Sequence, residues 1–288
     1  MTRQIAGSSP RVGLALSGGG ARGLAHIGVL KVLEREGVPI DCLAGTSMGG
    51  LIAASYAVGL TPDFLEQEAL RMASVRRLLA LVDPSLPRGG IFEGQKVYDY
   101  LVGHLGHRTF DDLRLPLALL AVDLNGGHEV ILSDGPVADA VRATISLPGI
   151  FTPVERDGQL LVDGGLLDNL PAGAARDMGA DVVIAVDVTT DSGAVTSLVE
   201  TLHHRRHIPN GLTDTVEVLF RSLGLMMGEI HRRRLAEARL DVIIQPAIPP
   251  GVTVLTGFPR AAEIIAAGEE AARRELPRIR ELLSPSGP

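Results

Sequence analysis

Residues 14–30 read LALSGGGARGLAHIGVL, and this stretch decides which kind of fold the chain can form. An apolar run over 11–17 ends in three consecutive glycines, and a helical spacing of apolar residues begins at Leu24. A short apolar run bounded by glycines is typical of a buried strand, and a glycine such as Gly37 is a common helix end. The stretch therefore predicts a strand, a glycine loop and a helix over 24–36.

The same order of elements follows immediately along the chain. The segment IDCLAGTS (40–47) reads as a second buried strand, and MGGLIAASYAVGL (48–60) reads as the helix after it. Two strand–helix units in sequence imply a right-handed crossover and parallel pairing of the strands. The chain is therefore predicted to form an α/β fold around a mainly parallel sheet.

The remaining segments extend this pattern without a clear domain boundary. Asn125-Gly126-Gly127 and Asp157-Gly158 mark the turns of two predicted hairpins. Residues 11–280 are expected to form one domain, with a flexible arm over 1–10 and a flexible tail over 281–288. The other predicted strands span 115–124, 128–134, 151–165, 181–189 and 240–246. The other predicted helices span 61–73, 94–106, 136–145, 169–178, 214–238 and 260–275.

Composition narrows the class of protein. The 288 residues are 45% apolar but only 3% aromatic, and the net charge of −7 argues against recruitment to nucleic acid or to an anionic membrane. The single cysteine, Cys42, lies in an apolar run and is predicted to be a buried structural thiol. No apolar stretch is long enough to span a bilayer, and 1–10 lacks the core of a signal peptide. A cytoplasmic protein is expected, with any membrane contact peripheral.

The glycine loop GGGARG (18–23) is consistent with more than one function. It fits G-x-G-x-x-G between a strand and a helix, which is the setting of a dinucleotide site. The acidic residue of that fingerprint would be Asp41. This residue stands at the beginning of the second strand, whereas a ribose-binding carboxylate belongs at the end of that strand. No Walker sequence is present, and a purely structural turn is a further alternative. Consecutive backbone N–H groups favour an anion of some kind.

The second strand supplies a candidate nucleophile. GTSMGG (45–50) contains G-x-S-x-G between a predicted strand and helix, the setting in which a serine lies exposed on a strained turn. Glycine is needed at Gly45 and Gly49 because the chain folds back sharply there. The N–H of Met48 is expected at the helix N-terminus, where it would face developing negative charge.

A nucleophilic serine needs a base, and the histidines are poor candidates. The histidines that follow Asp163, the aspartate considered below, lie in polar or charged segments and are predicted to be solvated. They are His203, His204, His207 and His231. Those that precede Asp163 show no spacing typical of metal ligands; they are His26, His104, His107 and His128. No metal site is predicted.

Asp163 is the better candidate for the base. It ends the apolar run QLLVD and is followed by Gly164 and Gly165, which leave room beside the carboxylate. An aspartate at the end of a buried strand can face a serine on a neighbouring strand. The alternative is an aspartate that only opens the turn before helix 169–178.

Three motifs in this order resemble the patatin-like phospholipase family. They are GGGARG, GTSMG and DGG, and the segments 21–34 and 143–154 are also similar to that family. The resemblance is strong over 11–190 and is closest to short bacterial members related to the neuropathy-target-esterase catalytic domain. It implies a three-layer α/β/α fold, a Ser–Asp dyad in place of a triad, and no cofactor.

The resemblance also implies the roles of single residues. Ser47 would be the nucleophile and Asp163 the base. The backbone N–H groups of Gly18, Gly19 and Gly20 would form the oxyanion hole, supported by Arg22. The substrate would be a lipid acyl ester such as a phospholipid or lysophospholipid.

Several questions stay open on the sequence alone. The stripe over 215–230 (Leu219, Phe220, Leu223, Met226, Met227 and Ile230) is predicted to be a core face, with an acyl-groove wall or membrane-facing patch as the alternative. Residues 190–213 are a candidate cover over the site. Rival functions are a nucleotide-dependent enzyme, a catalytically idle regulatory protein of the same fold, and an acyltransferase. The oligomeric state is not predicted.

Overall fold

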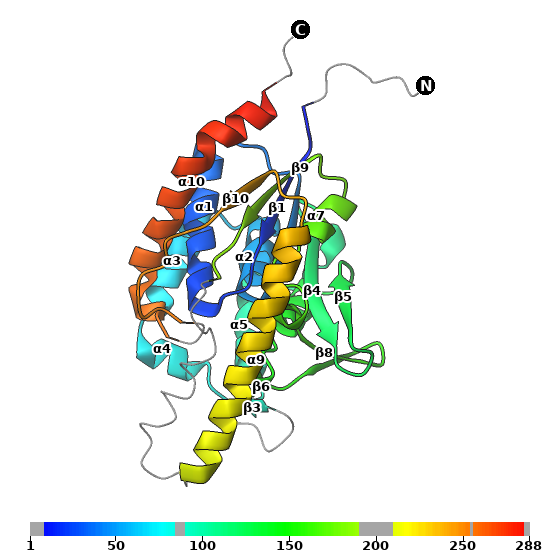
Figure 1. Ribbon diagram of the computed structural model, residues 1–288, viewed down its shortest axis with the longest axis vertical. Helices are drawn as coiled ribbons and strands as arrows, with labels where there is room; N and C mark the ends of the chain where they lie inside the picture. The colour runs from blue at the N-terminus through cyan, green and yellow to red at the C-terminus, as the bar shows by residue number, and fades with distance from the viewer. Residues whose placement is uncertain (1–8, 84–89, 190–209, 254–255, 285–288) are drawn as a thin grey trace.

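The computed structural model describes residues 9–83, 90–189, 210–253 and 256–284. Its centre is an eight-stranded sheet, whose order along the main path is β10-β9-β1-β2-β4-β8-β7, with β5 paired to β4 (Figure 1). The strands are β1 (Val12–Leu16), β2 (Cys42–Thr46), β4 (Leu117–Asp123), β5 (His128–Leu132), β7 (Val154–Arg156), β8 (Gln159–Asp163), β9 (Val182–Val186) and β10 (Val242–Ile244).

The sheet is parallel in one part and antiparallel in the other. Strands β10, β9, β1, β2 and β4 pair in parallel, as the repeated strand–helix order predicts. The hairpins β4–β5 and β7–β8 pair antiparallel, and β8 also pairs antiparallel with β4. This last pairing places Asp163 opposite Ala121, beside the parallel part of the sheet.

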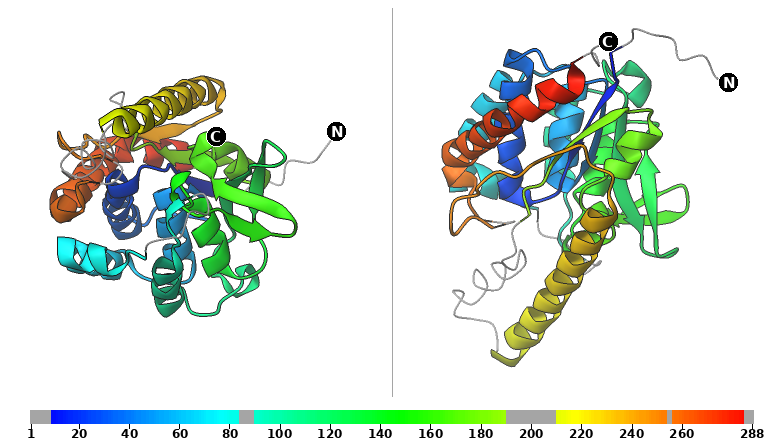
Figure 2. Two further views of the ribbon diagram at one scale, coloured as in Figure 1. Left: turned by 90° about the horizontal axis from the view of Figure 1, so that it is seen from below. Right: turned by 45° about the horizontal axis from the view of Figure 1, so that its top comes forward.

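Helices cover both faces of the sheet, so the predicted three-layer α/β/α fold is confirmed (Figures 1 and 2). Helices α1, α2 and α10 pack on one face, with α3, α5 and α6 around them, and α7 and the C-terminal part of α9 lie on the other. The helices are α1 (Ala25–Arg35), α2 (Ser47–Ala57), α3 (Pro62–Met72), α4 (Val75–Ala80), α5 (Gln95–Leu105), α6 (Val137–Thr144), α7 (Ala172–Asp177), α9 (Asn210–Glu237) and α10 (Ala261–Leu283).

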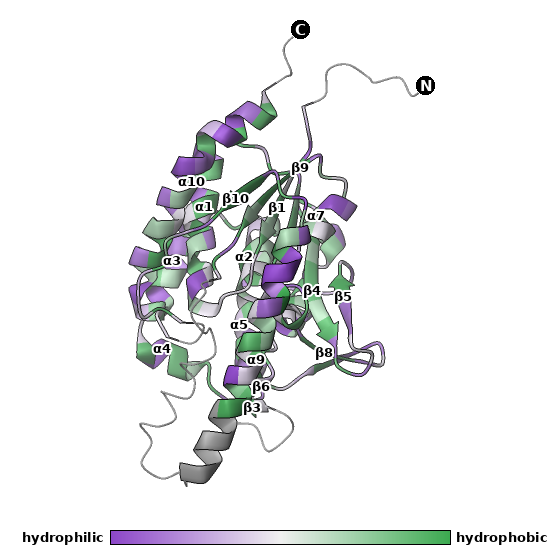
Figure 3. Cartoon of the chain, viewed as in Figure 1, coloured by the Kyte–Doolittle hydropathy of each residue, from purple (hydrophilic) through white to green (hydrophobic). Residues whose placement is uncertain are grey.

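Alternation along the central strands divides the core between the two faces. Leu14 and Leu16 of β1 point to the larger cluster under α1 and α10, while Ala15 points to the smaller cluster under α7. Strands β1, β9 and β10 are apolar throughout, as buried parallel strands are (Figure 3). Cys42 lies in the smaller cluster and is fully buried, as predicted, and burial raises the pKa of its thiol.

Helix α9 departs from the expectation of a core face. Leu219 and Met226 are 64% and 59% exposed, so the stripe does not pack as a whole into the core. Phe220 and Met227 lie against other parts of the chain, near Gly149 and Gly165 respectively. The stripe fails as a core face because α9 crosses the edge of the domain and extends past it (Figure 1).

The structure adds elements that the sequence did not predict. Helix α4 follows α3 after a short turn, and β3 (Gly90–Phe92) pairs in parallel with β6 (Gly149–Phe151) as a separate two-stranded sheet. Helix α10 continues to Leu283, beyond the expected domain end at residue 280. Most of the candidate cover, residues 190–209, lies outside the described residues. None of the helices in the described ranges is both long and apolar enough to cross a membrane.

Candidate active site

Ser47 occupies a strained turn between β2 and α2. Its φ of 54° lies in the left-handed region, which a residue with a side chain rarely adopts. The preceding Thr46 has extended backbone, so the chain reverses direction within two residues. The Ser47 N–H donates to Thr144 Oγ1 over 3.0 Å, and the Thr144 hydroxyl donates in turn to the Leu120 carbonyl. The turn is therefore held by the end of helix α6 and, through it, by strand β4.

Two glycines allow the backbone to pack closely around this turn. A Cβ atom at Gly45 would lie 2.6 Å from the Cα of Gly50, and one at Gly49 would lie 2.4 Å from the carbonyl oxygen of Leu16. Either contact would force helix α2 away from the strands. Glycine at these positions thus lets the helix N-terminus approach the end of β1.

Asp163 reaches the same turn from the end of β8. Its carboxyl group accepts the N–H of Gly165 over 2.8 Å and lies close enough to the Ser47 side chain to interact with it. The residue is only 3% exposed, and this burial raises the pKa of its carboxyl to about 6, although the Ser47 hydroxyl and the Gly165 N–H act in the opposite direction. The chain therefore provides a serine in contact with a buried carboxyl of raised basicity.

The glycine loop lies beside Ser47. A Cβ atom at Gly18 would lie 3.1 Å from the Cβ of Ser47, and Gly20 lines the same cavity as Ser47. Gly20 has a φ of 56°, and the loop continues as a short 3₁₀ helix, Gly20–Leu24, before α1. The Gly18 N–H donates to the Asn169 carbonyl over 3.0 Å, so it is already engaged. The N–H groups of Gly19 and Gly20, which follow it in the loop, make no such backbone hydrogen bond among the described residues.

Asn169 is a residue that the sequence analysis did not single out. It follows the Asp163 turn, and its side-chain Nδ2 donates to the Gly18 carbonyl over 3.3 Å while its own carbonyl accepts the Gly18 N–H. Asn169 therefore ties the glycine loop to the segment that carries Asp163. The only sequence signal was an amide residue shortly after the DGG motif.

Arg22 points away from solvent into a polar network beneath the loop. Its side chain is 2% exposed, burial lowers the pKa of the guanidinium, and the charge of Asp187 opposes this change. Asp187 in turn accepts from Thr189 Oγ1 over 2.6 Å and lies 3.2 Å from His231 Nε2. The buried Asp187 thus compensates the charge of an arginine that belongs to the glycine loop.

The prediction that His231 is solvated is wrong. Its side chain is 9% exposed and pairs with Asp187, because helix α9 brings it against the end of β9. His26 is also buried: its Nε2–H donates to the Ser17 carbonyl over 2.8 Å, and burial lowers the pKa of the imidazole to about 4. His26 is therefore neutral at physiological pH. The His26 ring contacts Ser17, just after β1, and the His231 ring contacts Asp187, just after β9.

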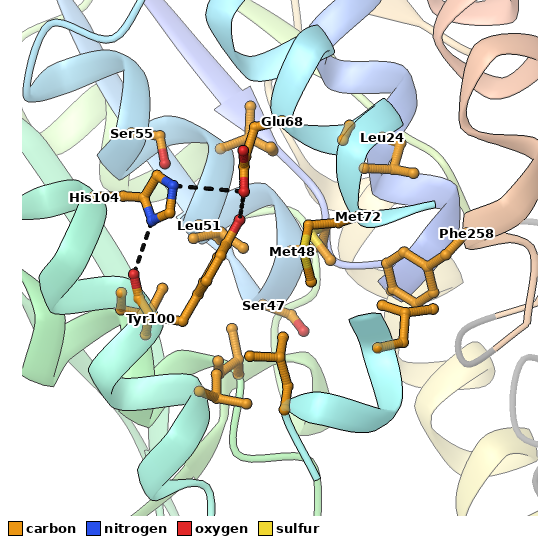
Figure 4. Close-up of a pocket in the computed structure, with 18 of the residues that line it drawn as sticks. Leu24, Ser47, Met48, Leu51, Ser55, Glu68, Met72, Tyr100, His104 and Phe258 are labelled. Atoms are coloured by element: carbon orange, nitrogen blue, oxygen red, sulfur yellow. Dashed lines mark hydrogen bonds and ion pairs between the residues drawn. The ribbon is translucent and has the colours of Figure 1, made fainter. Parts of the chain in front are cut away.

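A largely apolar cavity of about 360 Å³ opens beside Ser47 (Figure 4). Helices α2, α3 and α5 form most of its wall, and the segment around β6 and Phe258 completes it. Its size and lining are typical of a site for a small apolar ligand or chain. Apolar lining residues next to Ser47 include Leu24, Met48 and Leu51. Within the described ranges, no cluster of three or more His, Cys, Asp or Glu residues could hold a metal ion.

A mostly parallel sheet between two helical layers, with a serine turn after β2 and a glycine loop after β1, is the patatin architecture. The chain belongs to the patatin-like phospholipase family, since the model of that family matches residues 14–176, more than half of its length.

Relatives of this chain are found in bacteria and mammals. An uncharacterised NTE family protein of Mycobacterium tuberculosis is 40% identical over 181 residues, which is 63% of this chain and 50% of that protein. Patatin-like phospholipase domain-containing protein 6 of Mus musculus is 37% identical over 65% of this chain and 14% of its own length. The chain thus spans about half or less of these relatives. The crystal structure of VipD from Legionella pneumophila is 13% identical, with a TM-score of 0.49 over 96% of this chain and 69% of that one.

Proposed function

We propose that this protein is a serine hydrolase of lipid acyl esters in which Ser47 is the nucleophile and Asp163 the base. The observation that carries the proposal is the proximity of the Ser47 side chain to the buried carboxyl of Asp163, whose pKa it lowers against the effect of burial. Ser47 begins helix α2 and lines an apolar cavity, and Asp163 reaches it from the end of β8. Membership of the patatin-like phospholipase family supports a lipid substrate.

The reaction would proceed through an acyl-enzyme. Asp163 accepts the proton of Ser47 as Oγ attacks the acyl carbonyl, and the carbonyl electrons move to the oxygen. That oxyanion would accept hydrogen bonds from the N–H groups of Gly19 and Gly20, with Met48 N–H at the helix N-terminus nearby. The C–O bond to the alcohol then breaks, and the proton on Asp163 passes to the leaving alkoxide. A water molecule deprotonated by Asp163 then attacks the acyl carbon, the bond from that carbon to Ser47 Oγ breaks, and Asp163 returns the proton to Oγ as the acid is released.

The electrostatics of Asp163 suit this role. An aspartate with an ordinary pKa near 3.9 is a weak base for a hydroxyl group. Burial raises the pKa of Asp163 to about 6, which brings its basicity closer to the working pH of an enzyme while leaving it mostly ionised at neutral pH. The geometry requires no imidazole between the carboxyl group and the serine.

Labelling with a fluorophosphonate probe tests the nucleophile. We expect the probe to modify Ser47 covalently and turnover of p-nitrophenyl butyrate to fall by about 10³-fold or more in Ser47→Ala. Ser222→Ala, which removes an exposed hydroxyl on α9, is the matched control and should label and turn over like the unmodified protein. Modification of another serine, or full turnover in Ser47→Ala, would refute the assignment.

The rival functions make different predictions. A nucleotide-dependent enzyme would be stabilised thermally by a nucleotide bound at the glycine loop. A catalytically idle regulatory protein would neither label nor turn over esters. An acyltransferase would label at Ser47 but would pass the acyl group to an added alcohol in preference to water.

A further inference from the structure

The cavity beside Ser47 has a polar group of residues in an otherwise apolar wall (Figure 4). Glu68 comes from α3, and Tyr100 and His104 come from α5. The Tyr100 hydroxyl donates to Glu68, and His104 Nε2 lies 3.5 Å from the same carboxylate oxygen. A wall built only to hold an alkyl chain has no need for such groups.

Hydrogen bonding within this group fixes the roles of its atoms. Arg71 Nε donates to Glu68 over 2.6 Å, and this contact lowers the pKa of the Glu68 carboxyl, so that the group is ionised. His104 Nδ1 lies 2.9 Å from the Tyr100 carbonyl, which can only accept, so Nδ1 carries the proton. Nε2 faces the ionised Glu68 carboxylate, so both ring nitrogens of His104 lie against acceptor oxygens.

Ser55 adds a hydroxyl without a partner to this end of the cavity wall. It is only 5% exposed, its residue lines the cavity, and its hydroxyl has no hydrogen-bond partner among the described residues. Figure 4 shows Ser55 at the same end of the cavity as His104 and away from Ser47. Helices α2 and α5, which carry Ser55 and His104, contact each other.

The helix sets the distance from the nucleophile to this polar end. Ser47, Leu51 and Ser55 follow one another at intervals of four residues in α2, and all three line the cavity. At 1.5 Å per residue, Ser55 lies about 12 Å along the helix from Ser47. An extended chain advances roughly 1.2 Å per bond, so this distance corresponds to about ten bonds.

We infer that the cavity selects an acyl chain carrying a hydroxyl group about ten bonds from the ester carbonyl. The hydroxyl would hydrogen bond to Ser55, at the end of the cavity that also holds His104, Tyr100 and Glu68. This inference rests on the proposed function and names its substrate class. A plain alkyl chain of the same length would cover the Ser55 hydroxyl without pairing it, and a buried unpaired polar group is costly.

A pair of matched esters tests this selection. We compare kcat/KM for p-nitrophenyl ω-hydroxydecanoate with that for p-nitrophenyl decanoate, and take the ratio for each protein. The expected ratio is about tenfold higher in the unmodified protein than in Ser55→Ala or His104→Leu, the effect of one or two hydrogen bonds. Ser222→Ala, on the exposed side of α9, is the control and should keep the original ratio. Equal ratios in all four proteins would overturn the inference.

The design separates this inference from the proposed function. One outcome is that the unmodified protein hydrolyses p-nitrophenyl butyrate while the ratio of kcat/KM for the hydroxydecanoate to that for the decanoate stays the same in Ser55→Ala and His104→Leu. Only the inference then fails. If the unmodified protein hydrolyses no ester, the proposed function fails, and thermal shifts then test the cavity directly. In that case ω-hydroxydecanoic acid should stabilise the protein more than decanoic acid does, and Ser55→Ala should remove the difference. Equal shifts from the two acids would contradict the inference independently of catalysis.

Discussion

Asp163 determines the pH dependence that we expect of the reaction. Only the ionised carboxylate can accept the Ser47 proton, and burial raises the pKa of this carboxyl to about 6. The sign follows directly: kcat/KM should be constant above about pH 7 and fall about tenfold for each pH unit below about 6. The measurement is the pH–rate profile for p-nitrophenyl butyrate.

A histidine base would titrate in a similar range, so the profile needs a control. Adding an organic cosolvent such as methanol disfavours charge, which raises the pKa of a carboxyl group and lowers that of an imidazolium. We expect the acid limb of the profile to move to higher pH in methanol. Movement to lower pH would identify an imidazole as the base and remove Asp163 from that role.

The residues with roles in the site differ in how visible they are in the sequence. Ser47 and Asp163 each stand within two residues of two glycines because tight turns hold them, and such turns leave a local pattern. The pairing of His231 with Asp187 leaves none, since the two residues lie 44 positions apart and meet only when α9 packs against β9. A histidine within the charged run HRRRLAE looks solvated until that packing is known.

Helices α1 and α10 cross at very close range, and α1 is the helix that follows the glycine loop of the site. The helices approach so closely that a Cβ atom at Gly268 would lie 1.9 Å from the Ala25 carbonyl oxygen, and one at Gly28 would lie 2.0 Å from that of Ile265. We expect Gly268→Ala to lower the free energy of unfolding by about 1–3 kcal/mol, because the helices must move apart. Chemical denaturation measures this change.

Gly103 in α5 provides the matched control for that crossing. It is also a helical glycine, but no atom would lie within 4 Å of a Cβ built there. Gly103→Ala should therefore raise the free energy of unfolding by about 0.5–1 kcal/mol, the usual gain in helix propensity. Equal effects of the two substitutions would show that the close crossing does not govern stability.

Element type was predictable wherever the apolar pattern was long enough. Strands β1, β2, β4 and β9 are continuous apolar runs, and the two hairpins carry glycine turns, so all were found with small errors at their ends. Helix α4 and the pair β3–β6 were missed because they contain six and three residues, too few to show a period. Pairing between such distant short strands depends on tertiary packing alone.

At the scale of the whole molecule, the parallel pairing and the layers were predictable but the sheet order was not. Two strand–helix units imply parallel pairing through chain geometry, whereas helices on both faces were implied by the resemblance to the patatin-like phospholipase family. The position of β8 between β4 and β7 does not follow from any local signal, yet it brings Asp163 to Ser47. The partly exposed α9 was mistaken for a core face because its apolar spacing is the same in both situations.

The stability of the whole molecule should reflect the burial of Asp163. In the unfolded chain this carboxyl has an ordinary pKa near 3.8, whereas the folded value is about 6, so between these pH values only the unfolded state loses the proton. Stability therefore falls as pH rises through this window, by on the order of 3 kcal/mol above pH 6.

Asp163→Asn removes the charge, and its melting temperature should exceed that of the unmodified protein by several degrees near pH 8 but little near pH 4. Asp177→Asn, at an exposed site, is the control, and an Asp163→Asn shift that does not change with pH would contradict the burial argument.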